Sequence, residues 1–389
     1  MKVLHVITGL GIGGAEQQLR LLLSRLPAEV ECEVATLTNP GPVAEALRAD
    51  GVDVTHLAMS GNRDLTVLPR LTSVIRDGCY DVVHTHLYRA GVYGRIAARL
   101  AGVRAVVATE HSLGATQIEG RPLTFGTRAL YRAAERLGTG TVAVSATVER
   151  RLGGLGVPAG RIHLVPNGID PAAFRFSATA RATTRARLGI PEDAYVVGGV
   201  GRLVPAKNFD DLITAVAALP GTRLLLVGDG PEQIPLLRLA QDLGVQDRVR
   251  LTGAATADGE LAGLLAAMDL FVSPSAEESF GLALLEALAA GLPALYASCP
   301  AVADLPPAEA PGARRIALHE LPAALREERR AGPRRLPVPA AVERYHIART
   351  AERVVSLYEA ALYGADRRIP GQAAAAPAAE AAVPHPAEK

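Results

Sequence analysis

Two carboxylates stand in an apolar stretch of the sequence that reads EESFGLALLEALAAG from residue 277. Glu278 precedes a Ser-Phe-Gly turn, and Glu286 lies inside the run. With Ser279 as the N-cap, we expect a helix over 280–290 that carries Glu286 about 9 Å along its axis, at roughly 1.5 Å per residue. The two acids therefore need not touch, and each can reach a different end of an elongated ligand.

The first turn of this expected helix is a candidate anion site. Its leading amides lack partners within the helix and can face a negative group; they belong to Phe280, Gly281 and Leu282. Glu286 is flanked by leucine and alanine, and a partly buried carboxylate without a partner needs a ligand hydroxyl. In the structural alternative, Glu278 stabilises the helix dipole and Glu286 is an exposed helical residue.

A second anion site is expected in the segment GVGRLVPAKNFDDLITA. It places Arg202 and Lys207 beyond the carboxyl end of a strand, where open α/β sheets bind ligands. The chain has 41 basic residues, of which only Lys2, Lys207 and Lys389 are lysines. A lone interior lysine suggests a need for a compact ammonium group, and a surface pair of cations is the alternative.

A glycine-rich motif near the start, GLGIGG, gives Gly9, Gly11 and Gly14 the G-x-G-x-x-G spacing between a strand and a helix. NAD or FAD binding would also need an acid at the end of the second strand, which here reads ATLTNP. We therefore expect a general anion-binding turn before a helix that begins near Ala15. A tight turn without a ligand remains the alternative.

The sequence HTH presents two imidazoles at the exit of a strand. His84 and His86 alternate onto one side, but no third ligand is evident, so we expect no metal site. We favour two other interpretations: the two histidine side chains line the side of the site that receives the acceptor, or they pack in the core.

The elements that must position these residues alternate between short β-branched strands and helical patterns such as 15–26, 236–242 and 282–290. This alternation predicts parallel sheets covered on both faces, and a dozen units are too many for one sheet. The expected strands are 2–8, 31–37, 82–85, 103–109, 140–144 and 161–165 in one half, and 195–200, 223–227, 249–251, 270–273 and 293–296 in the other.

We therefore predict an α/β fold of two Rossmann-like, doubly wound domains. The expected limits are 1–172 for the N-terminal domain, 193–343 for the C-terminal domain, 344–364 for a final helix and 365–389 for a disordered tail rich in alanine and proline.

The overall charge narrows the classes of partner. A formal net charge of +1 gives no global field toward nucleic acid, so we expect no nucleic-acid partner. Three cysteines form no framework, the first residues do not resemble a signal peptide, and the longest apolar window is broken by Glu286 and Pro293. These features predict a cytoplasmic protein.

Four arginines could allow peripheral contact with the inner face of a membrane: Arg121, Arg128, Arg132 and Arg136. They partly share an expected helical face that could contact anionic lipid. In the alternative, this face is simply exposed to solvent.

Taken together, these stretches resemble the retaining GT-B glycosyltransferases of family 4, also called glycosyl transferases group 1. The matching segments run in family order from Gly11 to Pro293: GIGGAEQQL, DVVHTHLYRAGVYGRIAA, TEHS, VPNGID, GVGRLVPAKNFDDLI, LVGDGPE and EESFGLALLEALAAGLP. The resemblance implies two domains facing across a cleft, with a nucleotide-sugar donor held mainly by the C-terminal domain.

The resemblance also implies roles for the donor-binding residues. Arg202 and Lys207 would clamp the diphosphate, and Glu286 would accept the ribose hydroxyls. Glu278 would contact hydroxyls of the donor sugar, beside the amides of residues 280–282.

On the other domain, the resemblance implies that Gly13 and Gly14 bring a helix N-terminus to the phosphates when the cleft closes. His111, in TEHS, would face the donor sugar near the reacting carbon. No cofactor and no divalent ion are expected, because cations and helix termini neutralise the leaving diphosphate.

We therefore expect a nucleotide-sugar-dependent retaining hexosyltransferase. Its acceptor would be a sugar, a lipid-linked molecule or a small molecule, in exopolysaccharide, other polysaccharide or glycoconjugate biosynthesis; a secondary metabolite stays open. After Pro293 the sequence ALYASCPAVADLPP departs from the family, which often has a Gly-Gly-x-x-E loop there. The donor could be a UDP-, GDP- or other nucleotide sugar. A NAD-dependent oxidoreductase and a non-catalytic sugar-nucleotide binder remain as alternative functions.

Overall fold

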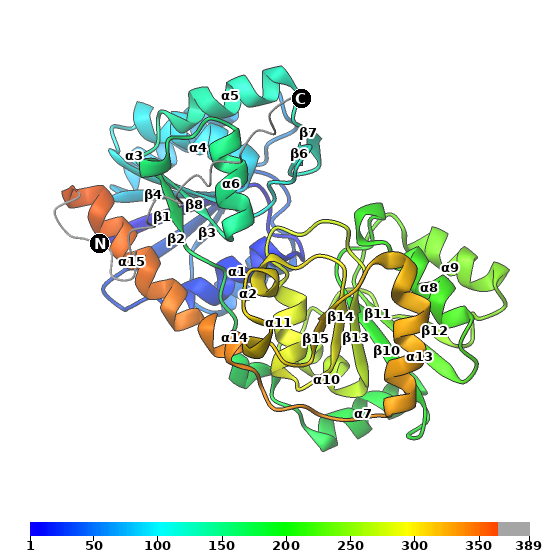
Figure 1. Cartoon of the computed structure of the whole chain (residues 1–389). Coiled ribbons are helices and arrows are strands. Elements are labelled where there is room, and N and C mark those ends of the chain that lie inside the picture. Colours follow the sequence, from blue (N-terminus) through cyan, green and yellow to red (C-terminus); the bar gives the residue numbers. More distant parts are fainter. Residues whose placement is uncertain (365–389) are drawn as a thin grey trace, which may run out of the picture.

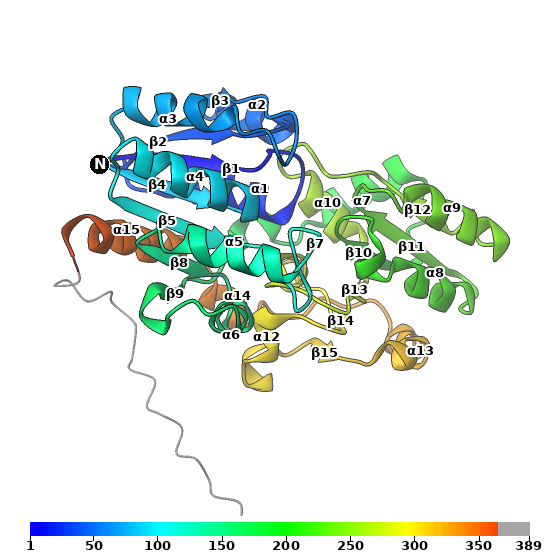
Figure 2. The ribbon, with the colours of Figure 1, turned by 90° about the horizontal axis from the view of Figure 1, so that it is seen from above.

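The computed structural model of the chain describes residues 1–364, so the expected tail over 365–389 lies outside the described residues. Two α/β lobes lie side by side, each with a sheet and helices on both of its faces (Figures 1 and 2). No helix within the described residues is both long and apolar enough to cross a membrane.

The N-terminal lobe contains a seven-stranded sheet in which every neighbouring pair is parallel. In spatial order its strands are β3 (Val54–His56), β2 (Glu31–Thr36), β1 (Lys2–Ile7), β4 (Val82–His86), β5 (Ala105–Glu110), β8 (Gly140–Ala143) and β9 (Ile162–Leu164). Its helices are α1 (Gly14–Leu23), α2 (Gly41–Ala49), α3 (Val67–Asp77), α4 (Tyr88–Leu100), α5 (Phe125–Glu135) and α6 (Ala146–Gly154). A small antiparallel hairpin joins β6 (Gln117–Ile118) to β7 (Arg121–Pro122).

The C-terminal lobe contains a parallel sheet of six strands. Their spatial order is β12 (Val249–Leu251), β11 (Thr222–Val227), β10 (Tyr195–Val200), β13 (Leu270–Ser273), β14 (Ala294–Tyr296) and β15 (Ala313–Arg315). The helices are α7 (Ala178–Leu188), α8 (Phe209–Ala217), α9 (Gln233–Asp242), α10 (Glu260–Ala267), α11 (Leu282–Ala289), α12 (Pro300–Ala303) and α13 (Leu321–Ala331).

Both sheets reverse their strand order at a point that positions the site. In the first sheet the reversal falls between β1 and β4, and in the second between β10 and β13. Loops that leave the carboxyl ends of such strands form a crevice in which ligands bind. The glycine motif follows β1 and the HTH segment ends β4, while Lys207 follows β10 and Glu278 follows β13.

The chain crosses between the lobes twice, and the two crossings pair with each other. Ile169 donates its amide to the carbonyl of Tyr345, and Ile347 donates to the carbonyl of Ile169, each at 2.8 Å. After α14 (Ala340–Arg344), the last helix α15 (Ile347–Tyr363) returns to the N-terminal lobe, as Figure 1 shows.

Helix α15 completes the core on one face of the first sheet. Because alternate strand residues point to opposite faces, Leu4 of β1 packs in the large core cluster that includes α4, whereas Val3 packs with Val354 of α15. Tyr358 of α15 hydrogen-bonds through its hydroxyl to Nδ1 of His84 at 2.6 Å.

Several expectations about local structure were wrong. The helix expected over 280–290 begins at Leu282, and its N-cap is Gly281 rather than Ser279. Gly281 has φ of +103°, which favours glycine, and a Cβ there would lie 2.3 Å from the sulfur of Cys299. Arg121 lies in β7 and not on the face of α5 with Arg128. The short strands β3 and β15 were missed.

Helix α7 falls in the stretch between the two expected domains. It packs against α10 of the C-terminal lobe, and we propose that it belongs to that lobe. The limits at 172 and 193 otherwise stay a prediction.

Candidate active site

An ion pair joins the two C-terminal loops that sequence reasoning singled out. Lys207, at the end of a short 3-10 turn (Pro205–Lys207), donates from Nζ to Oε1 of Glu278. Both side chains are partly buried. Arg202 is exposed and forms no ion pair with a carboxylate in the described chain. The structure thus brings Lys207 and Glu278 together and leaves Arg202 at the edge of the crevice.

The loop GDGP after β11 supports this arrangement. A Cβ on Gly228 would lie 1.8 Å from the carbonyl oxygen of Gly201, and a Cβ on Gly230 would lie 2.3 Å from that of Leu203. The backbone carbonyl of Asp229 accepts a hydrogen bond from the amide of Leu203 at 2.8 Å. Only glycine permits this close approach of two backbones, so the motif LVGDGPE fixes the loop that carries Arg202 and Lys207.

Glu286 lies one turn inside α11 and is partly buried. Burial raises the pKa of Glu286 to about 7. Within residues 1–364, no group donates a hydrogen bond to its carboxylate, and no cation forms an ion pair with it. Its oxygens are available within the described residues to accept hydroxyls of a ligand, and this role stays a prediction.

The N-termini of two helices, one from each lobe, lie close to each other. A Cβ on Gly14, the first residue of α1, would lie 3.6 Å from Cδ1 of Leu282, the first residue of α11. Gly13 is the N-cap of α1 in extended conformation. Both helix ends therefore direct partial positive charge toward the same region. Phe280 is buried against Tyr345, and its ring does not line this region.

Sequence reasoning missed Glu16, which stands in the first turn of α1. A Cβ on Gly13 would lie 2.5 Å from Oε2 of Glu16, so this carboxylate folds back over the start of the helix. Burial raises the pKa of Glu16. The positive charge of Arg202 opposes this rise, and the negative charge of Glu119 adds to it. Arg202 and Glu119 thus both act on the same carboxylate. An acid in the first helical turn, in GGAEQQ, was the available signal.

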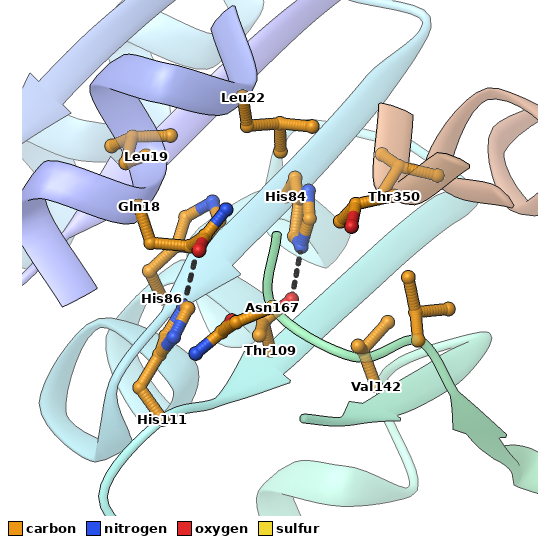
Figure 3. A pocket seen from close by; sticks show the side chains of 12 residues that line it. Gln18, Leu19, Leu22, His84, His86, Thr109, His111, Val142, Asn167 and Thr350 are labelled. Atoms are coloured by element: carbon orange, nitrogen blue, oxygen red, sulfur yellow. Dashed lines mark hydrogen bonds between the residues drawn. The ribbon is translucent and has the colours of Figure 1, made fainter. Parts of the chain in front are cut away.

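His111 follows β5 and stands at the end of a chain of three imidazoles. Figure 3 shows His111 beside His86, with Nε2 of His111 3.2 Å from Nδ1 of His86. Nε2 of His86 lies 3.0 Å from Nδ1 of His5 on β1. Burial lowers the pKa of His111 to about 4, so this ring is neutral at physiological pH.

The expectation that no third imidazole joins His84 and His86 was wrong. His5 is paired with His84 across β1 and β4 in the sheet register, and ligand atoms of the three buried rings lie within 4.8 Å of one another. Their nitrogens are nevertheless engaged with protein partners, including Tyr358 and Thr109 for His84. Of these rings, only Nε2 of His5 has no partner among the described residues.

A cavity of about 20 Å³ lies beside this cluster. It has room for one water molecule and is far too small for a sugar. The side chains of Gln18, Thr109 and Asn167 line it together with the histidines (Figure 3).

Three side-chain contacts tie the lobes together near these loops. Glu277 accepts from Nη2 of Arg151 at 2.5 Å, and Ser145 donates to the carbonyl of Ser279 at 2.6 Å. On another side, Arg20 of α1 pairs with Asp258 at 2.6 Å. The observed arrangement of the lobes therefore depends on specific polar contacts.

Two arginines of the N-terminal lobe, Arg89 and Arg121, form no ion pair with a carboxylate of residues 1–364. Arg89, in the first turn of α4, has a buried Nε with no hydrogen-bond partner within the described chain. Arg121 donates to Oδ1 of Asn62 at 2.8 Å and lies over the ring of Tyr88. Burial lowers the pKa of Arg89; the positive charge of Arg121 adds to this effect and the negative charge of Glu119 opposes it. Such a pair can receive an anionic group.

Two lobes with parallel sheets, each of which reverses its strand order at a switch point, form the GT-B fold. The family model Glycosyltransferase Family 4 matches residues 12–173, and Glycosyl transferases group 1 matches residues 180–306. The chain belongs to family 4 of the retaining, nucleotide-sugar-dependent glycosyltransferases.

Curated relatives support this assignment, and solved structures share the fold. The D-inositol 3-phosphate glycosyltransferase of Salinispora tropica is 33% identical over 336 residues, which cover 75% of this chain and 68% of the relative. That of Acidothermus cellulolyticus is 37% identical over 252 residues, or 59% of this chain and 54% of the relative. The structure of Anabaena HepE with UDP has a TM-score of 0.75 at 21% identity and covers 92% of this chain and 100% of HepE. HepE with UDP-glucose has the same TM-score and coverage at 20% identity.

Proposed function

We propose that this enzyme transfers a sugar, with retention, from a UDP-sugar to a hydroxyl of an acceptor that carries a phosphate. The observation that carries the donor half is the convergence of Lys207, Glu278 and the N-termini of α1 and α11 on one crevice. The choice of UDP is supported by HepE, a neighbour in fold that was solved with UDP and UDP-glucose.

The reaction follows from where positive charge stands. As the bond from C1 of the sugar to the diphosphate oxygen breaks, negative charge grows on that oxygen. Lys207 and the N-termini of α1 and α11 would stabilise this charge, together with the exposed Arg202. The acceptor oxygen then bonds to C1 on the same face, and its proton passes to the leaving diphosphate. Glu278 would hold the sugar hydroxyls and Glu286 the ribose, while His111 borders the reacting carbon.

The acceptor half of the proposal depends on Arg89 and Arg121. Neither guanidinium forms an ion pair with a carboxylate of the described chain, although the amide of Arg89 donates to Oε2 of Glu119 at 3.1 Å. The amide of Ala90, next to Arg89, lies 3.4 Å from the hydroxyl of Thr8, which follows β1. A phosphate on the acceptor would neutralise this pair. The names of the curated relatives, D-inositol 3-phosphate glycosyltransferases, support a small phosphorylated polyol. A lipid-linked phosphate, as in glycan assembly, shares the same recognised group.

A two-stage binding and transfer experiment tests the proposal. Calorimetry with UDP, GDP, ADP, dTDP and NAD should give measurable affinity for UDP above the others. Transfer assays with UDP-glucose, UDP-N-acetylglucosamine and UDP-galactose then compare D-inositol 3-phosphate, myo-inositol and a polyprenyl phosphate sugar as acceptors. Turnover of a neutral acceptor in preference to both phosphorylated ones would overturn the acceptor half, and preference for GDP would overturn the donor half.

A further inference from the structure

Glu278 is held on both sides by one helix of the opposite lobe. Glu277, which precedes it, accepts a hydrogen bond from Arg151 of α6 at 2.5 Å. Ser279, which follows it, accepts through its carbonyl from the hydroxyl of Ser145 at 2.6 Å. Ser145 is the N-cap of the same helix and also accepts from the amide of Val148. The position of the donor-side carboxylate is therefore set by residues of the N-terminal lobe.

The same carboxylate of Glu277 reaches the segment that follows His111. Its Oε1 accepts from the amide of Ala115 at 2.7 Å, and Nη1 of Arg151 donates to the carbonyl of Leu113 at 2.8 Å. This segment leads directly into the hairpin β6–β7, which carries Arg121. One ion pair thus joins the loop of Glu278 to the stretch between His111 and Arg121.

From this geometry we infer that Glu277 and Arg151 are positioning residues that couple closure of the lobes to the placement of Glu278 and of the acceptor segment. The inference rests on the proposed function for the role of Glu278. When the pair is formed, Glu278 and the segment 113–115 are fixed relative to each other. When the lobes separate, the hydrogen bonds that Glu277 accepts from Arg151 and Ala115 break together. Glu278 on the donor side and the segment 113–115 on the acceptor side then lose their fixed relative positions.

The expected consequence is chemical as well as structural. An enzyme that closes poorly admits water, and water can attack C1 of the donor, releasing free sugar and the nucleoside diphosphate. Loss of the pair should therefore change the partition between transfer and hydrolysis. A side chain with a purely structural role would lower both rates together or would lower stability alone.

The chain supplies a matched control in the second interlobe ion pair. Arg20 donates to both carboxylate oxygens of Asp258, at 2.6 and 3.1 Å, and also pairs with Asp50 of its own lobe. Asp258 is largely exposed and stands far along the chain from Glu278. D258A thus removes an interlobe contact while the contacts of Glu277 stay intact.

The test compares the wild type with E277A, E277Q, R151A, the double variant R151A/E277A and D258A. We expect E277A and R151A to lower kcat for transfer by roughly tenfold to a hundredfold, the range that small misplacement of reacting groups produces. The ratio of hydrolysis to transfer should rise, and UDP affinity should stay within about threefold, because Glu277 does not form the donor site. D258A should stay within about fivefold of wild type, as exposed pairs contribute little.

Two further measurements separate this inference from the proposed function and from misfolding. The double variant should lose less activity than the product of the two single losses, since the interaction that the two side chains share is removed only once. E277Q, which keeps an acceptor oxygen for Ala115, should lose less than E277A. Hydrogen exchange without any nucleotide should show that E277A, and not D258A, loosens residues 113–119.

Equal effects of E277A and D258A, or additive losses in the double variant, would overturn the coupling. If the wild type binds none of the nucleotides, the proposed function fails, while the exchange measurement still decides whether Glu277 holds the segment 113–119.

Discussion

Lys207 and Glu278 form an ion pair with each other, although the family resemblance assigns them to different groups of the donor. The lysine would contact the diphosphate and the glutamate the sugar, so the pair stands where those two parts of a nucleotide sugar join. Each charge is partly buried and stabilises the other before a donor arrives. Removal of either one leaves its partner uncompensated in the crevice.

Lys207→Ala should therefore abolish measurable transfer and weaken UDP binding by roughly tenfold to a hundredfold, the range for loss of a hydrogen bond to a charged group. The fold should stay intact, because the glycine contacts of Gly228 and Gly230 hold the loop independently. Calorimetry with UDP and a thermal unfolding curve check both statements. Turnover equal to wild type would contradict the assignment of Lys207.

Glu286 should make UDP binding depend on pH. Its pKa is raised to about 7 by burial, and ribose hydroxyls that donate to it favour the ionised form. UDP binding should therefore release a proton near pH 7, and affinity should weaken as the pH falls from 8 to 6. Calorimetry in buffers of different ionisation enthalpy measures the released proton. Glu286→Gln should abolish the release; if the variant binds UDP with the same pH dependence as wild type, another group is responsible.

The same raised pKa has a consequence for stability. The folded protein holds a proton on Glu286 between pH 4.5 and 7 that the unfolded chain has lost. The stabilising contribution of this group is therefore complete below the unfolded pKa and is lost as the pH rises through about 7. Glu286→Gln should flatten the fall in melting temperature between pH 5 and pH 8. An unchanged slope would show that Glu286 is well solvated in the folded state.

His111→Ala should lower kcat by roughly tenfold to a hundredfold and leave UDP affinity within about twofold, because in the proposed function His111 borders the sugar and not the nucleotide. Since burial lowers its pKa to about 4, His111 stays neutral above pH 5. The wild-type rate should therefore show no loss from protonation of this ring between pH 6 and 8. A matching loss of UDP affinity in the variant would place His111 at the nucleotide instead.

Arg89→Ala and Arg121→Ala should each raise the KM for a phosphorylated acceptor about tenfold, with UDP affinity unchanged. The KM of wild type should also rise with salt, as expected for charge recognition. Arg136→Ala serves as the matched control, since Arg136 is the exposed C-cap of α5. If all three variants behave alike, the pair does not receive the acceptor phosphate.

The sequence was sufficient to predict the parallel strands and the carboxyl-end loops, because both depend on local patterns. Buried runs such as residues 195–200 carry the strand signal by themselves, and Lys207 and Glu278 follow strands directly. The short strands β3 and β15 were missed because three residues of polar composition, such as ARR in β15, carry no periodicity. The N-cap at Gly281 was missed because the local sequence shows neither its positive φ nor its position against Cys299, 18 residues further along the chain.

The residues that support the site were harder to predict. His5 joins His84 and His86 only through the register of β1 on β4, and the pairing of strands is not written in a local pattern. Arg151 and Glu277 lie on different lobes, and nothing in their own segments distinguishes them from other surface charges. Contacts of this kind are decided by how the two lobes meet.

The return of α15 reverses the order in which the lobes can mature during synthesis. The buried cluster within the C-terminal sheet is complete once Leu325 has been made. The first sheet, although translated earlier, lacks Val354 and Tyr358 on one face until the ribosome has passed them. On the ribosome the C-terminal lobe can therefore fold first. The N-terminal lobe keeps one apolar face of its sheet uncovered until the last described helix has been made.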